Sequence, residues 1–123
     1  MAAPVLKQGI FLIASIQEAL SDTEWQQLRD NLLQMTGKHR SRGVVVDVTA
    51  MDVVDSFACR ILRELVQMLK LRGAEAIIVG IAPDVAFAMV QLGLRMEGVS
   101  TALDLEEGME ILQGRFDAER RRG

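Results

Sequence analysis

The chain of 123 residues has one cysteine, one histidine and no tyrosine, and each shortage excludes a class of protein. Because Cys59 is the single cysteine, no internal disulfide can form, which favours a reducing, intracellular setting. One cysteine and one histidine cannot supply the ligands of a zinc cage. His39 lies in a basic stretch, and no feature of the sequence brings it to a serine as the base of a hydrolase triad. We therefore expect no metal site and no triad.

Other familiar features are also missing. The start, Met1-Ala2-Ala3-Pro4, has neither the basic segment nor the apolar core of a secretory signal, and no apolar run approaches the roughly 20 residues of a membrane helix. The net charge is −3, and aromatic residues do not lie among basic ones, which argues against nucleic-acid binding. No glycine-rich phosphate loop follows the first strand. We expect a cytoplasmic protein with no cofactor, no nucleic-acid partner and no membrane partner.

The hydrophobic pattern predicts an α/β fold in one domain. Residues 44–48 and 76–81 are almost wholly apolar and rich in β-branched side chains, as in parallel strands buried on both faces. Between them, residues 57–71 have the apolar spacing of an amphipathic helix, with Phe57, Ile61, Leu65, Met68 and Leu69 on one face. A strand, a helix and a strand in this order predict a right-handed βαβ unit.

The first third of the chain predicts a hairpin and a helix. Gly9 stands where a tight turn needs a positive φ between two short apolar runs. Ser21 and Glu24 form a capping box, which marks the start of a helix. Gly37 is expected to be its left-handed C-cap. Residues 38–42 are then expected to form a basic loop.

The last third predicts two helices with a weak strand between them. Pro83 starts a helix that is apolar nearly all round, and a strand over 99–103 follows. Asp104 starts a final amphipathic helix. The domain is expected over residues 1–114 as a mixed sheet of four to five strands with about four helices, and residues 115–123 as a charged, fraying tail. The sequence leaves open whether three residues of this apolar helix belong to the core or to an interface: Val85, Met89 and Leu92.

The most informative residue is Ser56, which stands at the turn between a buried strand and a helix. Its hydroxyl should lie outside the core, and three roles are open to it. Serine is a favoured N-cap, worth about 1 kcal/mol over alanine, although Asp55 could serve equally well. A nucleophile would need a general base, and none is in view. A phosphate acceptor is physically reasonable because the amino end of a helix favours negative charge. Residue chemistry alone favours the cap.

A phosphate on Ser56 would change binding more than folding. It adds about two negative charges beside Asp52 and Asp55, and each close pair costs about 1–4 kcal/mol at a surface-like dielectric. A domain with a stability of about 5–15 kcal/mol survives this repulsion. The same few kcal/mol change a binding constant roughly 10- to 1000-fold. The site is thus suited to switching partners.

A phosphate-accepting receiver domain is a weaker alternative. Asp47 lies near the end of a buried strand, as a phosphorylated aspartate would. A receiver also needs an acidic pair after its first strand to hold a divalent cation, and residues 14–17 are neutral.

Residues 46–58, with Asp55-Ser56 near their end, resemble the motif of STAS domains, the family of anti-sigma-factor antagonists. Three further blocks occur in the same order as in the RsbS group of that family, the single-domain scaffolds of the stressosome: residues 12–17, residues 79–83 and residues 101–106. The resemblance runs from about residue 5 to about residue 112.

This resemblance implies a non-catalytic scaffold that assembles with copies of itself and with RsbR-type STAS paralogues into a large complex. The complex would hold an RsbT-type serine kinase and release it when Ser56 is phosphorylated, and a PP2C-type phosphatase would reset it. Asp52, Asp55, Phe57 and Arg60 are expected to contact the kinase around Ser56. The alternative is a free anti-sigma-factor antagonist that binds an anti-sigma kinase one to one.

Two other residues are expected to be structural. The resemblance puts Thr49 near a region where RsbR-type relatives carry phosphorylated threonines, but a threonine that closes a strand more often bonds to the backbone. Cys59 is expected to be a small buried hydrophobe, with a redox role less favoured.

Overall fold

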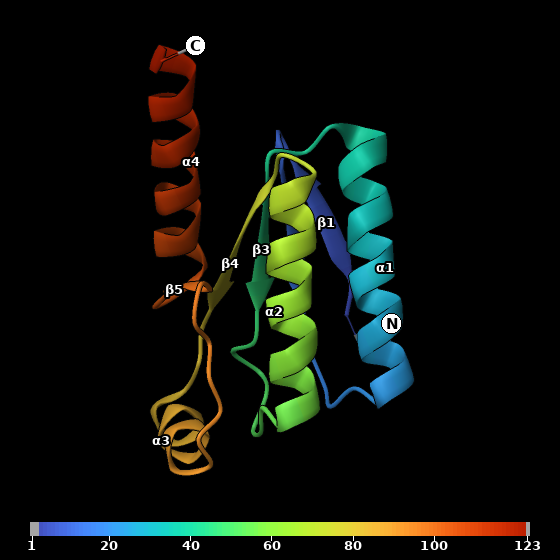
Figure 1. The fold of residues 1–123 in the computed structure, drawn as a ribbon, viewed down its shortest axis with the longest axis vertical. Coiled ribbons are helices and arrows are strands. Elements are labelled where there is room, and N and C mark those ends of the chain that lie inside the picture. The colour runs from blue at the N-terminus through green and yellow to red at the C-terminus, as the bar shows by residue number, and fades with distance from the viewer. Residues whose placement is uncertain (1–2, 123) are drawn as a thin grey trace.

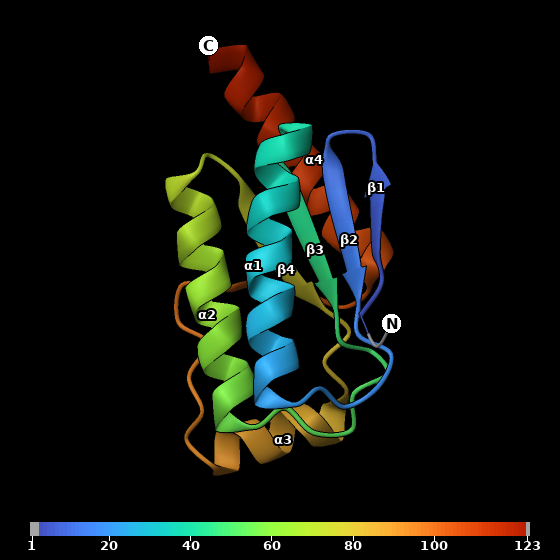
Figure 2. The same cartoon turned by 90° about the vertical axis from the view of Figure 1, so that its right-hand side faces the viewer.

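The computed structural model describes residues 3–122, which form one five-stranded sheet with helices on both faces (Figures 1 and 2). The strands are β1 (Val5–Gln8), β2 (Phe11–Ser15), β3 (Gly43–Asp47), β4 (Glu75–Val79) and β5 (Ser100–Ala102). The helices are α1 (Asp22–His39), α2 (Ser56–Leu71), α3 (Pro83–Gln91) and α4 (Leu105–Arg122). The strand order in the sheet is β1-β2-β3-β4-β5, with β1 antiparallel and the other neighbours parallel. The predicted α/β fold with a mixed sheet is confirmed.

The hairpin at the amino end turns at Gly9, as expected. Gly9 has a φ of 60°, and the register pairs Gln8 with Phe11 across the turn. A residue with a Cβ would be strained in this left-handed conformation, which explains the glycine.

The sheet is buried on both faces because α1 and α2 cover one face and α4 covers the other (Figure 2). On β3, Val44 and Val46 belong to the core beneath α1 and α2, whereas Val45 packs with Leu112 of α4 on the opposite side. All three valines are fully buried. Such alternation requires apolar side chains at successive positions, which is the pattern that the sequence shows.

Helix α4 lies unusually close to the sheet because Gly108 faces it. A Cβ on Gly108 would lie 2.6 Å from Cγ1 of Val79 on β4. Gly43, at the start of β3, also faces α4, because a Cβ there would lie 3.0 Å from Cδ1 of Leu112. These two glycines set the spacing between the helix and the strands.

The start of α1 was predicted correctly, but its end was not. The amide of Glu24 donates to Oγ of Ser21 at 3.1 Å, and the Ser21 amide donates to Oε1 of Glu24 at 2.9 Å, which completes the capping box. Gly37 is not the C-cap, because the helix continues to His39 and Arg40 takes the left-handed conformation with a φ of 52°. The basic stretch therefore begins in the last turn of α1, with Lys38 and His39, and only its remainder is a loop.

The charged tail also differs from the expectation. Residues 115–122 continue α4 instead of fraying. Contacts with distant segments hold them: Nη1 of Arg115 lies 3.2 Å from Oε2 of Glu75, and Nη2 of Arg42 lies 2.8 Å from Oε1 of Glu119. The Arg42 guanidinium also lies 5.5 Å from the ring centroid of Phe116.

Helix α3 lies across the end of the sheet at which the parallel strands finish (Figures 1 and 2). Of the three residues left open, Val85 and Met89 are buried in the core, and Leu92 is 72% exposed. On α2, Met68 was placed wrongly on the core face; it is 38% exposed because the buried stripe runs through Leu65 and Leu69.

None of the helices within residues 3–122 combines the length and the apolar character needed to cross a bilayer.

Candidate functional site

Ser56 is the first residue of α2, and it lies at the end of the molecule where β3 finishes (Figure 1). The loop that leads to it is anchored from within, because the side chains of Met51 and Val54 are buried. Between these anchors, Asp52 and Val53 point outward, and Val53 is 68% exposed. The loop thus presents a short exposed surface immediately before the helix.

Asp55, and not Ser56, caps α2. Oδ1 of Asp55 accepts a hydrogen bond from the Ala58 amide at 2.8 Å, and the Asp55 backbone is extended, with a φ of −84°. Ser56 is exposed, and its hydroxyl makes no hydrogen bond with any residue from 3 to 122. The capping role therefore falls to the aspartate, and the serine hydroxyl has no structural task.

The four residues expected to contact the kinase all lie within four positions of Ser56 in the sequence. Asp52 and Asp55 are exposed on the preceding loop, and Arg60 is exposed one turn later. Phe57 is half-buried and packs against the core beneath α1 and α2. The surface at the amino end of α2 therefore combines two carboxylates, a free hydroxyl and part of an aromatic ring.

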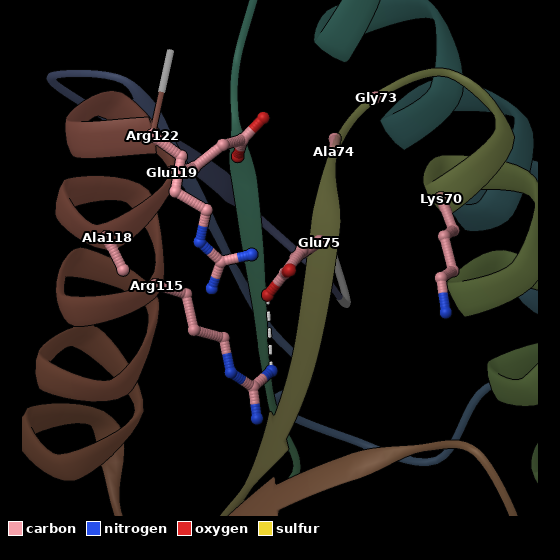
Figure 3. A pocket seen from close by; sticks show the side chains of 8 residues that line it. All are labelled: Lys70, Gly73, Ala74, Glu75, Arg115, Ala118, Glu119 and Arg122. Atoms are coloured by element: carbon pink, nitrogen blue, oxygen red, sulfur yellow. Dashed lines mark hydrogen bonds and ion pairs between the residues drawn. The ribbon is translucent and has the colours of Figure 1, made fainter.

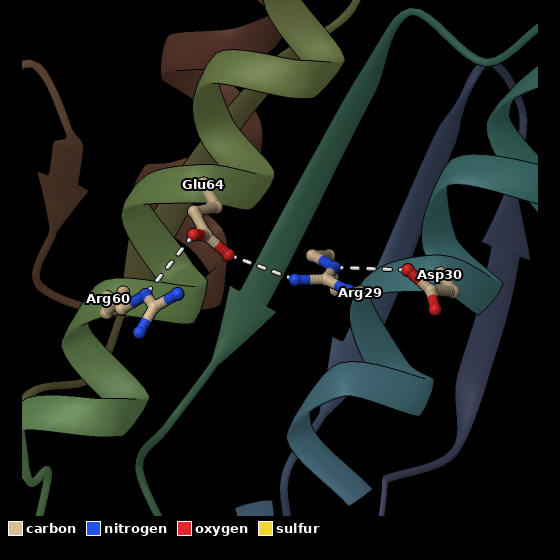
Figure 4. A network of polar contacts seen from close by, with 4 residues as sticks. All are labelled: Arg29, Asp30, Arg60 and Glu64. Atoms are coloured by element: carbon tan, nitrogen blue, oxygen red, sulfur yellow. Dashed lines mark hydrogen bonds and ion pairs between the residues drawn. The ribbon is translucent and has the colours of Figure 1, made fainter. Parts of the chain in front are cut away.

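The Arg60 guanidinium belongs to a small network that joins α2 to α1 (Figure 4). Nε of Arg60 lies 3.3 Å from Oε2 of Glu64, and Oε1 of Glu64 lies 2.9 Å from Nη1 of Arg29. Arg29 also pairs with Asp30 at 3.0 Å. Sequence reasoning missed Arg29 because its partner is 35 residues away. Val53 was missed too, although an apolar residue between acidic ones in a turn was a usable signal.

Thr49 is part of a structural junction at the end of β3. Its amide donates to Oδ1 of Asp47 at 2.9 Å, and its hydroxyl donates to the same oxygen. It therefore bonds to a side chain, not to the backbone as expected. A Cβ on Gly80, whose φ is 83°, would collide with the Thr49 hydroxyl, so this position requires glycine.

Cys59 lies one turn into α2 and is fully buried, as the sequence predicted. Burial raises the pKa of its thiol above the ordinary value of 9.0, because the charged form is desolvated there. A thiol with a raised pKa is a poor nucleophile at neutral pH.

The one histidine of the chain, His39, lies far from Ser56. His39 lies in the last turn of α1, at the opposite end of the helix from the end that lies near Ser56. An 18-residue helix is about 27 Å long, so the imidazole does not reach the serine. Within residues 3–122, no three His, Cys, Asp or Glu side chains are grouped to hold a metal ion.

The fold is a mixed β-sheet covered by helices, and an exposed serine begins α2. These features together indicate the class of domain. The family model of the STAS domain matches residues 3–108, and this chain belongs to that family. A serine-to-glutamate variant of RsbS from Moorella thermoacetica superposes with a TM-score of 0.80 at 31% identity, covering 95% of this chain and 99% of that one. The sequence-based resemblance to STAS domains and to RsbS is confirmed.

Two further relatives point to the same group. A chain from a structure of the molecular architecture of the stressosome has a TM-score of 0.72 at 30% identity, with 91% of this chain and 97% of that chain covered. The RsbT co-antagonist protein RsbRA of Bacillus subtilis is 33% identical over 90 residues, which are 72% of this chain. The matched part of the chain spans 33% of the length of this curated relative.

Proposed function

We propose that this chain is a cytoplasmic, non-catalytic scaffold of a bacterial stressosome that holds an RsbT-type serine kinase and releases it when Ser56 is phosphorylated. The observation that carries the proposal is that Asp55 and Ser56, at the start of α2, have different roles. Asp55 alone caps the helix, so the exposed Ser56 hydroxyl is free to be modified without loss of a structural hydrogen bond. The membership of the STAS family and the similarity to RsbS support this role.

Electrostatics at this position favour a switch of binding. A phosphate on the first residue of α2 gains about 0.3–1 kcal/mol from the amino end of the helix. It is repelled by Asp52 and Asp55, which are exposed and therefore screened by water and salt. The two effects largely offset each other in the free domain. A kinase surface that packs over the same residues excludes water, so it would meet the full repulsion.

The proposed kinase-binding surface consists of Asp52, Val53, Asp55 and Phe57 around Ser56, with Arg60 at its rim. Similarity to an RsbT co-antagonist and to a stressosome component supports RsbR-type paralogues as assembly partners and a large assembly that includes further copies of this chain. A PP2C-type phosphatase would remove the phosphate and restore kinase binding.

The direct test is phosphorylation by the RsbT-type kinase with ATP, followed by mass mapping of the modified residue. Wild type should gain one phosphate on Ser56, Ser56→Ala should gain none, and Thr49→Ala should be modified like wild type. Phosphate on Ser56→Ala would place the acceptor elsewhere.

Assembly separates the scaffold from a free antagonist. On size-exclusion chromatography with an RsbR-type partner, a scaffold enters a very large particle. A free antagonist elutes as a small one-to-one complex with its kinase and ignores the paralogue.

A further inference from the structure

The end of the molecule opposite Ser56 is strongly basic. Helices α1, α2 and α4 all finish there (Figure 1). Segments 38–42, 70–75 and 115–122 together contain nine Lys or Arg and three Asp or Glu, a formal charge of +6. Since the whole chain carries −3, the remaining residues carry −9. Such separation of charge indicates that this end meets anions.

A cavity of about 380 Å³ opens at this basic end, between the last turns of α1 and α2 and the start of β3. Arg40, Arg42 and Arg72 line it, together with Ser41, and no acidic residue does. Its volume lies within the range of small-ligand sites. The guanidinium groups come from three separate segments, which suits an anion with several oxygens.

Several polar groups at this cavity lack partners. Within residues 3–122, neither Arg40 nor Arg72 forms an ion pair or donates a side-chain hydrogen bond; only Arg42 is paired, with Glu119 at 2.8 Å. Ser41 is 4% exposed, and its hydroxyl oxygen is buried without a hydrogen-bond partner. A buried, unpaired hydroxyl is destabilising, so an orphaned group beside unpaired arginines points to a ligand.

Gly37 makes room for one of these arginines. A Cβ at this position would lie 2.6 Å from Nη2 of Arg72. Gly37 is inside α1, where glycine costs about 0.5–1 kcal/mol relative to alanine. The glycine thus lets the guanidinium of Arg72 lie against α1 at the rim of the cavity, at some expense to the helix.

A neighbouring cavity in the same region serves as a comparison, because acidic residues line it as well as basic ones (Figure 3). It has a volume of about 410 Å³ and is lined by both basic and acidic residues. There Arg115 pairs with Glu75 at 3.2 Å, and Glu119 is bound by Arg42. Both of its carboxylates form ion pairs with arginines, whereas no acidic residue lines the first cavity.

The carboxyl ends of α1 and α2 oppose an anion, because each carries about half a negative charge. Three guanidinium groups bring three positive charges to the same place. Even when the charge of Glu119, the partner of Arg42, is counted, the net charge around the cavity stays positive.

We propose that this cavity is a binding site for a phosphate group, held by Arg40, Arg42 and Arg72 with the Ser41 hydroxyl as a further donor. The ligand class is a phosphate monoester or inorganic phosphate. The site is independent of Ser56, so it stands or falls apart from the proposed function.

The test is titration of the full chain with inorganic phosphate, followed by calorimetry and by amide NMR, with sodium chloride added to hold the ionic strength constant. Saturable shifts are expected at Gly37, Ser41 and Gly73, with none at Ser56. Arg72→Gln removes one charge-assisted contact and should weaken binding roughly 10- to 100-fold. Arg115→Gln, in the neighbouring cavity, is the matched control and should change affinity less than about 2-fold.

Two further variants keep the test decisive. Ser41→Ala should raise the melting temperature of the free protein, since it removes an unpaired buried hydroxyl, while it weakens phosphate binding about 3- to 10-fold. Gly37→Ala should push the end of the Arg72 side chain aside and weaken binding, by less than Arg72→Gln does. Opposite signs for stability and binding at Ser41 would not arise from a purely structural residue.

A parallel titration with O-phosphoserine separates the two sources of the phosphate group. Binding at least 10-fold tighter than that of inorganic phosphate identifies a phosphorylated side chain, and equal binding identifies a small free anion; both outcomes support the site. Shifts that do not saturate, or equal affinity in wild type and Arg72→Gln, overturn it.

Discussion

The two ends of helix α2 make opposite use of charge. At the amino end, Asp52 and Asp55 stand exposed beside Ser56, and the one hydrogen bond that matters locally is the cap from Asp55 to Ala58. At the carboxyl end, Arg72 lies among other arginines at a cavity that contains an orphaned hydroxyl. The first end is thus acidic around an exposed hydroxyl, and the second is basic around a buried one.

This difference shows how a small domain can keep two surfaces electrically apart. A 16-residue helix is about 24 Å long, more than two Debye lengths at physiological salt. A change of charge at one end is therefore weakly felt at the other. The following experiments test this separation, beginning with the largest expected effect.

Thiol labelling compares the solvent accessibility of position 56 with that of Cys59, one turn further along α2. Ser56→Cys, made together with Cys59→Ala, should react with a thiol reagent as fast as a free peptide thiol. The wild-type Cys59, one turn further on, is fully buried and should react at least about 10³-fold more slowly, because labelling requires opening of the domain. Comparable rates at the two positions would show that Ser56 is shielded or that α2 opens locally.

Added charge at the amino end should act on kinase binding and not on folding. Ser56→Glu is expected to weaken binding of the RsbT-type kinase about 10- to 1000-fold and to leave the melting temperature within a few degrees. Gln67→Glu adds the same charge to the exposed face of α2 three turns later and should leave affinity within about 2-fold. Calorimetry of both variants gives the comparison. Equal losses would mean that net charge alone controls binding.

Helix α4 runs from the packed middle of the domain to the basic end. It has one glycine in each part, Gly108 against the sheet and Gly114 in open space. Gly108→Ala forces a Cβ against Val79 and should lower the free energy of unfolding by about 1–3 kcal/mol. Gly114→Ala meets nothing within 4 Å and should raise it by up to about 1 kcal/mol. Urea unfolding measures both. A loss at Gly114 would mean that the second half of α4 is packed as tightly as the first.

The assignment of the cap is tested by two aspartates of the same loop. Asp55→Ala removes the bond to the Ala58 amide and should cost about 1 kcal/mol of unfolding free energy. Asp52 is exposed and caps no helix, so Asp52→Ala should change the free energy of unfolding, measured in urea, by less than about 0.5 kcal/mol. If Ser56 were the true cap, Asp55→Ala would behave like Asp52→Ala and Ser56→Ala would carry the loss.

The smallest effect concerns the network that joins α1 and α2 near the amino end. The Arg29 side chain is 20% exposed and contacts both Glu64 and Asp30, so Arg29→Gln should cost about 0.5–1 kcal/mol. The Arg60 side chain is 65% exposed, and Arg60→Gln should cost less than about 0.5 kcal/mol. The difference should shrink at high salt. If Arg60→Gln cost more than Arg29→Gln, Arg60 would be the residue that ties the two helices together.

Much of the fold could be predicted because its signals are local. The apolar runs of β3 and β4 require burial on both faces, and the Ser21–Glu24 capping box specifies a helix start within four residues. The turn at Gly9 needs only the conformational freedom of one residue. The position of the candidate site followed for the same reason, since it lies directly between a predicted strand and a predicted helix.

The parts that could not be predicted depend on distant partners or on a shift of one residue. Asp55 and Ser56 are both good caps, and only the register of the helix start decides between them. The last turns of α4 are held by contacts such as Arg42 with Glu119, which are 77 residues apart. Gly37 has the properties of a helix terminator, but its value here is the space that it leaves for Arg72. No local pattern contains this information.

The order of the strands has a consequence for how the domain is made. Each strand lies beside its predecessor in the sequence, from β1 to β5. During synthesis, every newly emerged strand therefore finds its template already in place, and no strand has to wait for a later one to separate it from a wrong neighbour. Pairing in this serial order requires no rearrangement of strands that are already paired.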